Sequence, residues 1–195
     1  MQGNSRAPYP FPKQKSEEIK RTTIILEKEE REFIESLIAD GKESGIKQLI
    51  SKMLDIYKSL MIYDWHFPGE YYCGISRMAL VNVELFNLLT QQIPKEQWRD
   101  IGRQMGVALN VSIGSTLGVD SSEQASWEKV FERLKAQGFG DFYLKDKFLL
   151  LKTPFINECE IWRGLMEGLL CVELETRNSV PPLVFVIKKN KQIQV

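Results

Sequence analysis

The stretch KRTTIIL, residues 20–26, decides how the first third of this chain is expected to fold. Residues 22–25 within it are all β-branched. Two heavy atoms on Cβ restrict a side chain in a helix and pack well on a pleated surface, so such residues favour extended backbone. The stretch is therefore predicted to form one short strand.

Two helices are predicted directly after this strand. Beyond Glu27 the apolar residues recur every three or four positions, as on one face of a helix that stops near Gly41. Ser44 is a suitable N-cap for a second helix, whose apolar face runs from about Ile46 to Leu60. One strand and two helices cannot enclose a core alone, because domains below about 40 residues usually need a staple or a partner. Residues 20–62 are therefore expected to fold only as a dimer.

This order of elements resembles the N-terminal module of the Arc/MetJ/CopG family of ribbon-helix-helix regulators. The likeness rests on the Lys20–Leu26 strand, the charged first helix, the Gly turn and the second helix, and it covers about a fifth of the chain. In that family one strand from each subunit pairs into an antiparallel ribbon, and β-ribbons of this kind enter a DNA groove. The resemblance implies an obligate homodimer, a double-stranded DNA operator as partner, and repression of transcription.

The alternation of side chains along the strand selects the residues that would read bases. If Leu26 and every second residue before it point to the helices, then Arg21, Thr23 and Ile25 point to the DNA. Arginine can bond O6 and N7 of one guanine, and threonine offers a hydroxyl and a methyl group. Ile25 departs from the family, which usually has a polar residue here. It either touches thymine methyl groups or indicates that the register is shifted by one residue.

A second DNA contact is implied at the start of the second helix, where free backbone amides can hold a phosphate. The matching positions here are Ser44 and Gly45, with Lys47 close by, and Lys20 on the strand is a further phosphate contact. The turn from Gly41 to Gly45 is one residue longer than the commonest family spacing. The capping residue of the second helix therefore stays open.

The charge of the chain gives no support to nucleic-acid binding. Lys plus Arg and Asp plus Glu both total 26, and residues 20–61 carry eight of each sign. A basic field that would attract DNA is therefore missing, and any DNA affinity has to come from where the charges lie.

Two flanking segments complete the predicted domain organisation. Residues 1–19 contain three prolines among aromatic and charged residues and are expected to be a flexible arm, either an inert leader or a contact to DNA or to the second domain. The adjacent proline and glycine in residues 66–70 break the helical period and predict a domain boundary. The second domain is placed at residues 70–195.

The second domain is predicted to be α+β with an antiparallel sheet. Helices are expected where apolar residues recur at helical spacing, and strands where short apolar runs flank a turn. Gly138 is expected to end one of the helices. Helices are predicted at about 94–111, 127–137 and 158–170, strands at 142–144, 148–151 and 183–188, and a loop at 114–122, while 77–89 fits either a strand or a helix.

The inventory of reactive side chains argues against an enzyme. His66 is the only histidine, so one chain cannot assemble a histidine metal cluster. His66 is interpreted as a linker residue and not as the histidine of a Ser/His/Asp triad, with a pH or metal sensor as the alternative. The glycines between residues 102 and 118 are spaced like helix contacts and lack the lysine of a phosphate-binding loop. No catalytic residue, metal or cofactor is predicted.

The three cysteines, Cys73, Cys159 and Cys171, form no CxxC pair and suit free thiols of a cytoplasmic protein. A redox-sensing thiol is the alternative, with Cys73 as the first candidate. No apolar run reaches the roughly 18 residues of a spanning helix, so no membrane partner is expected.

A second resemblance concerns the end of the chain. Thr153–Asn157 and Trp162–Leu170 are similar to the C-terminal part of the 4-vinyl-reductase family of sensor domains, although the cysteine cluster usual there is missing. The resemblance implies a pocket for a small apolar effector. The alternative is that Trp162, Leu165 and Leu169 simply fill the core.

These patterns together predict a dimeric, sequence-specific transcription regulator whose second domain senses a ligand or joins dimers, with a tetramer as one outcome. The first alternative is an antitoxin, whose tail would be disordered until bound to a toxin. The second is a ligand-binding or enzymatic domain whose N-terminal segment only dimerises.

Overall fold

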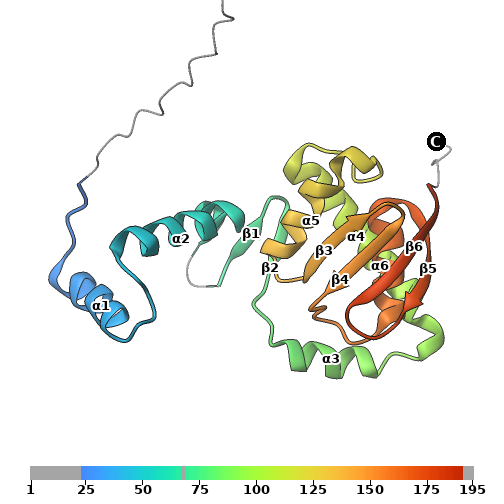
Figure 1. The fold of residues 1–195 in the computed structure, drawn as a ribbon, viewed down its shortest axis with the longest axis horizontal. Helices are drawn as coiled ribbons and strands as arrows, with labels where there is room; N and C mark the ends of the chain where they lie inside the picture. Colours follow the sequence, from blue (N-terminus) through green and yellow to red (C-terminus); the bar gives the residue numbers. More distant parts are fainter. Residues whose placement is uncertain (1–22, 67–68, 191–195) are drawn as a thin grey trace, which may run out of the picture. The chain divides into compact units, whose positions relative to one another are not determined.

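The structure, a computed structural model, describes residues 23–66 and 69–190 (Figure 1). By its internal contacts the chain divides into two units, one ending at Ile46 and one beginning at Lys47, and each is described by itself. The predicted arm, residues 1–19, lies outside the described residues. The domain boundary predicted between residues 62 and 70 stays a prediction.

The described residues of the first unit, from 23 onward, contain the helix α1, from Lys28 to Ala39, which agrees with the predicted first helix. A capping box begins it, in which the Glu27 amide donates to Glu30 Oε2 at 2.9 Å. Gly41 follows the helix with φ +69°, a conformation that glycine adopts without steric cost. Residues 23–27 form no strand within the single chain. The ribbon would take its hydrogen bonds from a second chain, and it stays a prediction.

The second unit opens with α2, Ile46–Ser59, followed by the 3₁₀ turn η1, Ile62–Asp64. A short hairpin of β1, Tyr71–Cys73, and β2, Ser76–Met78, comes next. The hairpin contacts the helix α4, Trp98–Leu117, where the hydroxyls of Ser76 and Ser112 lie 2.6 Å apart.

A four-stranded antiparallel sheet forms the centre of the second unit, so the predicted α+β class with an antiparallel sheet is confirmed for this part of the chain. The strand order is β3-β4-β6-β5, which leaves β3 and β5 at the edges. The predicted hairpin and final strand are present, whereas β5 was not predicted. The strands are β3, Asp141–Lys145, β4, Phe148–Lys152, β5, Val172–Asn178, and β6, Leu183–Asn190.

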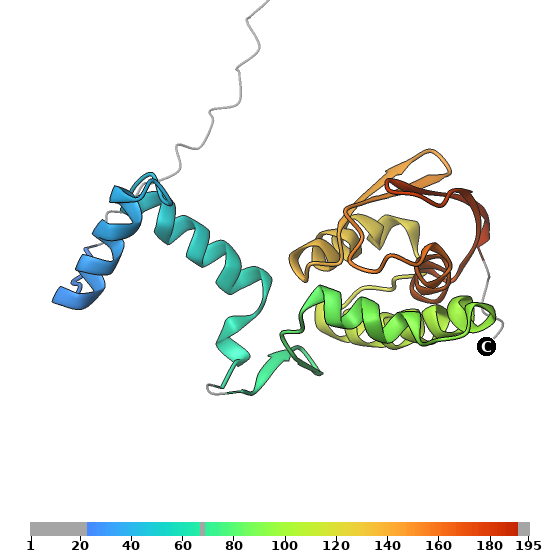
Figure 2. The same ribbon diagram turned by 90° about the horizontal axis from the view of Figure 1, so that it is seen from below.

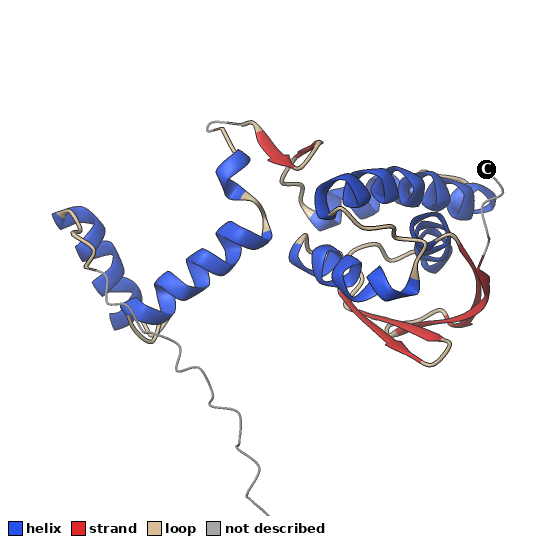
Figure 3. Cartoon of the chain, turned by 90° about the horizontal axis from the view of Figure 1, so that it is seen from above, coloured by secondary structure: helices blue, strands red, loops and turns tan. Residues whose placement is uncertain are grey.

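Helices cover one face of this sheet (Figures 2 and 3). The helices α5, Trp127–Ala136, and α6, Cys159–Leu170, both contact strands, and α4, Trp98–Leu117, packs on the far side of α6. Gly138, at φ +83°, ends α5 as predicted. The core between these layers is filled by side chains with no more than 1% exposure, among them Trp127, Leu134, Trp162, Leu165 and Leu169. The interpretation of Trp162, Leu165 and Leu169 as core residues is therefore confirmed.

The helices α4 and α6 approach so closely that only glycine fits at the contact. A Cβ atom added at Gly102 would overlap the carbonyl oxygen of Ile161, and one at Gly106 would overlap that of Leu165. Gly164 and Gly168 on α6 meet the backbone of α4 in the same way. The expectation of helix contacts is thus confirmed for Gly102 and Gly106.

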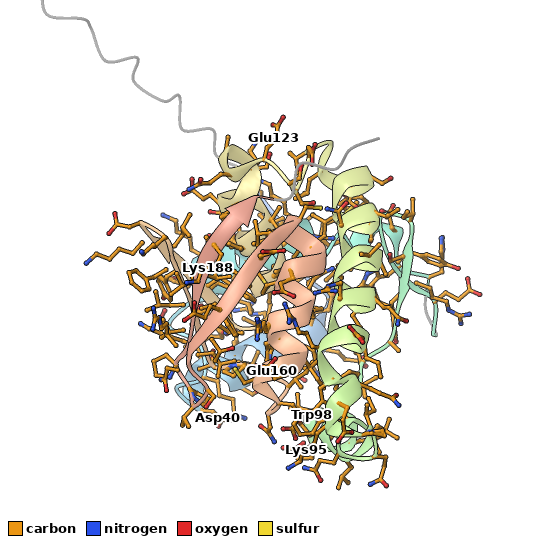
Figure 4. The ribbon with its side chains drawn as sticks, turned by 90° about the vertical axis from the view of Figure 1, so that its right-hand side faces the viewer. Asp40, Lys95, Trp98, Glu123, Glu160 and Lys188 are labelled. Atoms are coloured by element: carbon orange, nitrogen blue, oxygen red, sulfur yellow. The ribbon has the colours of Figure 1, made fainter. Side chains whose placement is uncertain are left out.

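The helix α4 differs from its prediction at both ends. Its first turn is preceded by the 3₁₀ turn η2, Lys95–Gln97, and Lys95 Nζ lies 5.7 Å from the centroid of the Trp98 ring (Figure 4). At its other end the helix continues through Gly114 to Leu117, so the predicted loop at 114–122 is wrong for its first part. Ile113 in this last part of the helix is buried in the core, and Gly118, at φ +64°, is the C-cap that ends α4.

Residues 77–89, which fitted either a strand or a helix, contain the end of β2 and most of α3, Val83–Gln91. Asn82 caps α3 by accepting a hydrogen bond from the Leu85 amide. Asn87 is buried and ties α3 to the segment before α6, donating to the Phe155 carbonyl at 2.8 Å and accepting from the Asn157 amide at 2.9 Å. Among the described residues, no helix combines the length and apolar character that crossing a bilayer requires.

Candidate functional site

The residues predicted to read bases are only partly described. Arg21 lies outside the described residues, as does Lys20. Thr23 and Ile25 are exposed, and Ile25 keeps 93% of its accessible surface. An apolar side chain this exposed in one chain is free to contact another molecule.

The residues predicted to hold a phosphate lie around the start of α2. Ser44 and Gly45 directly precede the helix, and Lys47 is its second residue, with an exposed side chain. The first turn of α2 contains no acidic residue. The positive end of the helix dipole is therefore not neutralised within that turn.

Neither α1 nor α2 buries a side chain in the single chain. Several of their apolar residues are half-buried, and others are exposed, such as Phe33, which is 64% exposed, and Met53 and Leu54. The exposed ion pairs Lys28–Glu32 and Arg31–Glu35 lie on α1, and the hydrogen bond from Arg31 to Glu35 raises the pKa of Arg31. Charged side chains and an uncovered apolar face therefore share the same short helix.

The C-terminal end of α2 is held by Arg133, a buried residue of α5. Its guanidinium donates to the Ser59 carbonyl oxygen and lies 3.4 Å from the sulfur of Met61. Burial lowers the pKa of Arg133, although the group stays a cation. A positive charge at this end of a helix is favourable because the carbonyl groups there carry partial negative charge. Arg133 thus links α2, the second helix of the predicted module, to α5.

Glu167 on α6 is the centre of a charge cluster and has only 2% of its side chain exposed. Arg99 donates to both of its carboxylate oxygens, Arg103 donates to Oε2 at 2.9 Å, and the Leu174 amide donates to Oε1 at 3.0 Å. Burial would raise the pKa of Glu167, but these hydrogen bonds outweigh it, and the pKa lies below its ordinary value. Arg163 is also near, with Nε 3.6 Å from Oε1. The cluster joins α4, α6 and β5.

A groove of about 620 Å³ lies between α5 and the edge strand β3. Its lining includes the buried rings of Phe131 and Phe142, stacked with centroids 5.4 Å apart. The exposed carboxylates of Glu128 and Glu132 come from α5. The groove therefore offers an apolar surface beside two negative charges.

A smaller pocket of about 240 Å³ is lined mainly by apolar side chains, among them Leu60, Met78 and Leu80. It is a candidate for the predicted effector pocket, which stays a prediction. Within the described part of the chain, no three His, Cys, Asp or Glu side chains form a group able to hold a metal ion.

Cys159 and Cys171 are free thiols, as predicted. Burial raises the pKa of Cys159 to about 11, with a contribution from the neighbouring Glu160, and burial also raises the pKa of Cys171. Oxidation proceeds through the thiolate, so these surroundings do not activate either sulfur. The side chain of Cys73, the first candidate for a redox sensor, is not described.

Sequence reasoning missed the Glu167 cluster, Arg133 and the groove. The sequence contains one indication of Glu167, because it is the single acid in the apolar run from Leu165 to Leu170. Arg133 had none, because its partner Ser59 lies 74 residues away in the sequence. The groove had none either, because it requires β3 to be an edge strand, which depends on the strand order of the folded sheet. Comparison of the chain with protein-family models, curated proteins and solved structures finds no match. The geometry of these sites and the sequence patterns therefore carry the functional argument.

Proposed function

We propose that this protein is a dimeric, sequence-specific DNA-binding regulator that represses transcription. The observation that supports it most is that two amphipathic helices, α1 and α2, follow the β-branched segment and bury no side chain in a single chain. Apolar helix faces of this kind are covered when a second copy completes the core. The strands of the two copies would then pair, and Arg21, Thr23 and Ile25 would face the major groove.

Phosphates would be held at the start of α2. Ser44, Gly45 and Lys47 supply backbone amides and a positive charge at the positive end of a helix dipole, and Lys20 adds a second charge. The eight acids in residues 20–61 offset the basic residues, so affinity per dimer is expected to be modest and to fall with salt.

The second domain is proposed to sense a ligand or to join dimers. Its own buried core favours this over the antitoxin alternative, because an antitoxin tail that folds only on its toxin would lack such a core. The enzymatic alternative has no catalytic group in its favour among the described residues.

The test is selection of bound sites from random double-stranded DNA with the full chain, followed by binding of the selected site by Arg21→Ala. Loss of a bidentate guanine contact is expected to weaken specific binding by roughly tenfold or more at fixed salt. Lys129→Ala is the matched control, because it removes one positive charge from an exposed position of α5. Equal loss in both variants, or selection of no site, would contradict the proposal.

Dimerisation is tested separately by sedimentation equilibrium. Leu54→Asp places a charge on the exposed apolar face of α2 and is expected to shift the protein to a monomer that no longer binds the selected site. A wild-type monomer at micromolar concentration would contradict the dimeric module.

A further inference from the structure

The groove between α5 and β3 has one wall made of strand edge. Among the described residues, β3 pairs only with β4, so its other side presents backbone groups that no strand covers. Four consecutive residues of β3, 141–144, line the groove. Since neighbouring side chains on a strand point to opposite faces, an unbroken run of lining residues means that the groove follows the backbone of the strand.

The opposite wall is one face of α5. Its lining positions, Glu128, Phe131, Glu132 and Lys135, recur at helical spacing. From Glu128 to Lys135 the helix rises roughly 10 Å, and the five residues of β3 extend roughly 16 Å. The groove therefore matches an extended segment of about four or five residues laid beside β3.

The charges that line the groove indicate which side chains such a segment would have. Lys135 Nζ lies 2.6 Å from Asp141 Oδ1, so these two charges neutralise each other at one end. Glu128 and Glu132 are exposed and carry the remaining charge of the lining, which is negative. A long basic side chain can lay its apolar stem over Phe131 and place its cation beside either carboxylate.

We propose that this groove binds an extended segment of a partner protein, which pairs with β3 as a fifth strand and places basic side chains at alternate positions toward Glu128 and Glu132. Backbone hydrogen bonds to β3 would supply affinity, and the alternate side chains would supply specificity. This interaction is independent of the proposed binding to DNA.

A second copy of this chain is a poorer occupant of the same edge. A two-fold symmetric pairing of β3 with β3 would bring the same patch of both copies together. Glu128 and Glu132 of one copy would then approach those of the other, and like charges repel. A basic segment meets the same carboxylates with attraction.

The probe is the fluorescein-labelled heptapeptide TVTRTRT, whose valine and arginines occupy alternate positions and can all face the groove. Its arginines lie about 7 Å apart, close to the roughly 6 Å of one helical turn between Glu128 and Glu132. Its binding to the full chain is followed by fluorescence anisotropy. We expect saturable binding that weakens about tenfold or more when glutamate replaces both arginines. N-methylation of alternate backbone amides, tested for both sets, is expected to abolish binding for the set that faces β3. Absence of saturable binding, or equal binding of both methylated peptides and the parent, would overturn the proposal.

Variants of the protein locate the site. Glu128→Lys combined with Glu132→Lys is expected to weaken peptide binding about tenfold or more, because both side chains are exposed and can be exchanged without disturbing the core. Glu84→Lys combined with Glu96→Lys makes the same change in net charge at two exposed positions outside the groove and is expected to bind the peptide as the wild type does. Thermal melts of all variants show that each is folded. Equal binding by the groove variant and the control would overturn the proposal.

Hydrogen exchange tests the strand pairing itself. Addition of the peptide is expected to slow exchange of amides within 141–145, the residues of β3. If these amides instead become protected as the protein concentration rises without peptide, a second copy occupies the edge, and the proposal is overturned.

Discussion

Arg99 on α4 holds the buried carboxylate of Glu167 on α6 with two hydrogen bonds, one of 2.9 Å from Nε to Oε2 and one of 2.7 Å from Nη2 to Oε1. The same carboxylate accepts the amide of Leu174 at the start of β5. One side chain therefore joins two helices and an edge strand, and its removal is expected to destabilise the whole second unit.

Glu167→Gln is expected to lower the free energy of unfolding by about 2 kcal/mol, because it removes the charge that faces two guanidinium groups inside the fold. The expected loss of stability is small because Arg99 and Arg103 are about two-fifths exposed, so water can solvate their guanidinium groups in the variant. Urea denaturation measures the change. Glu160→Gln, at a position with a partly exposed side chain, is the control and is expected to cost about 0.5 kcal/mol or less. Equal losses for the two variants would contradict the role of Glu167.

The stability of the second unit is expected to fall in acid through the same residue. The pKa of Glu167 lies below its ordinary value in the folded chain, so its contribution is complete above the unfolded pKa of about 4.3 and is lost as the pH falls through the folded pKa. Urea midpoints measured from pH 6 downward are therefore expected to decline less steeply below about pH 4.3 in Glu167→Gln than in the wild type. Parallel curves would contradict the prediction.

Gly106→Ala is expected to destabilise the protein by about 3 kcal/mol, because the new Cβ would overlap the carbonyl oxygen of Leu165 and force α4 and α6 apart. Gly114→Ala lies on the same helix, but its Cβ would lie 3.2 Å from the Val119 carbonyl oxygen and needs only a small adjustment. A change within about 1 kcal/mol is expected there, since alanine also favours the helix. Thermal melts of both variants measure the loss of stability that each substitution causes. A mild effect at Gly106 would mean that the helices are not in backbone contact.

Arg133→Met is expected to release the end of α2 while leaving the core folded. Methionine keeps much of the apolar stem but cannot donate to the Ser59 carbonyl oxygen. Hydrogen exchange of residues 56–61 is expected to speed up, with little change in α6. Lys129→Met, an exposed change on the same helix, should leave both segments as they are. Unchanged exchange in Arg133→Met would show that this contact does not hold α2.

Cys159 is expected to be alkylated slowly in the folded chain. Its pKa of about 11 leaves almost no thiolate near neutral pH. Modification by iodoacetamide at pH 8, followed by mass spectrometry, is expected to be at least tenfold slower in the native protein than in urea, where the pKa returns to about 8.5. Similar native and unfolded rates would contradict a buried thiol.

The helices that sequence reasoning placed well are those with a strong local period and a clear stop. The face of α5 repeats at helical spacing from Trp127, and Gly138 ends it, so the helix could be placed within a residue or two. The end of α4 was placed too early, because Gly114 looks like a loop residue in the sequence, whereas the C-cap that ends the helix is Gly118, four residues later. The strand β5 was missed because only two apolar residues, Val172 and Leu174, alternate with its charged residues, which is too short a pattern to identify a strand without its pairing with β6.

Part of the candidate site could also be predicted from the sequence, and part could not. The predicted base-reading and phosphate-binding residues follow from the sequence of one short module, and they need no knowledge of the second domain. Arg133 and the groove beside β3 could not be predicted, because each is formed by segments that only tertiary packing brings together. The role of Asn87 could not be predicted either. It is a polar residue in the apolar stretch of α3, and it donates a hydrogen bond to the carbonyl of Phe155, 68 residues away.

The sequence by itself determined that KRTTIIL is followed by two amphipathic helices, that the second domain is α+β, and that one chain, with a single histidine, cannot form a cluster of histidine metal ligands. These are properties of neighbours along the chain, where backbone preference and apolar period act over a few residues. Only the tertiary structure decided that Glu167 meets Arg99 across 68 residues and that β3 is left at an edge beside α5. The free energy of such contacts depends on geometry between packed elements, which no local pattern encodes.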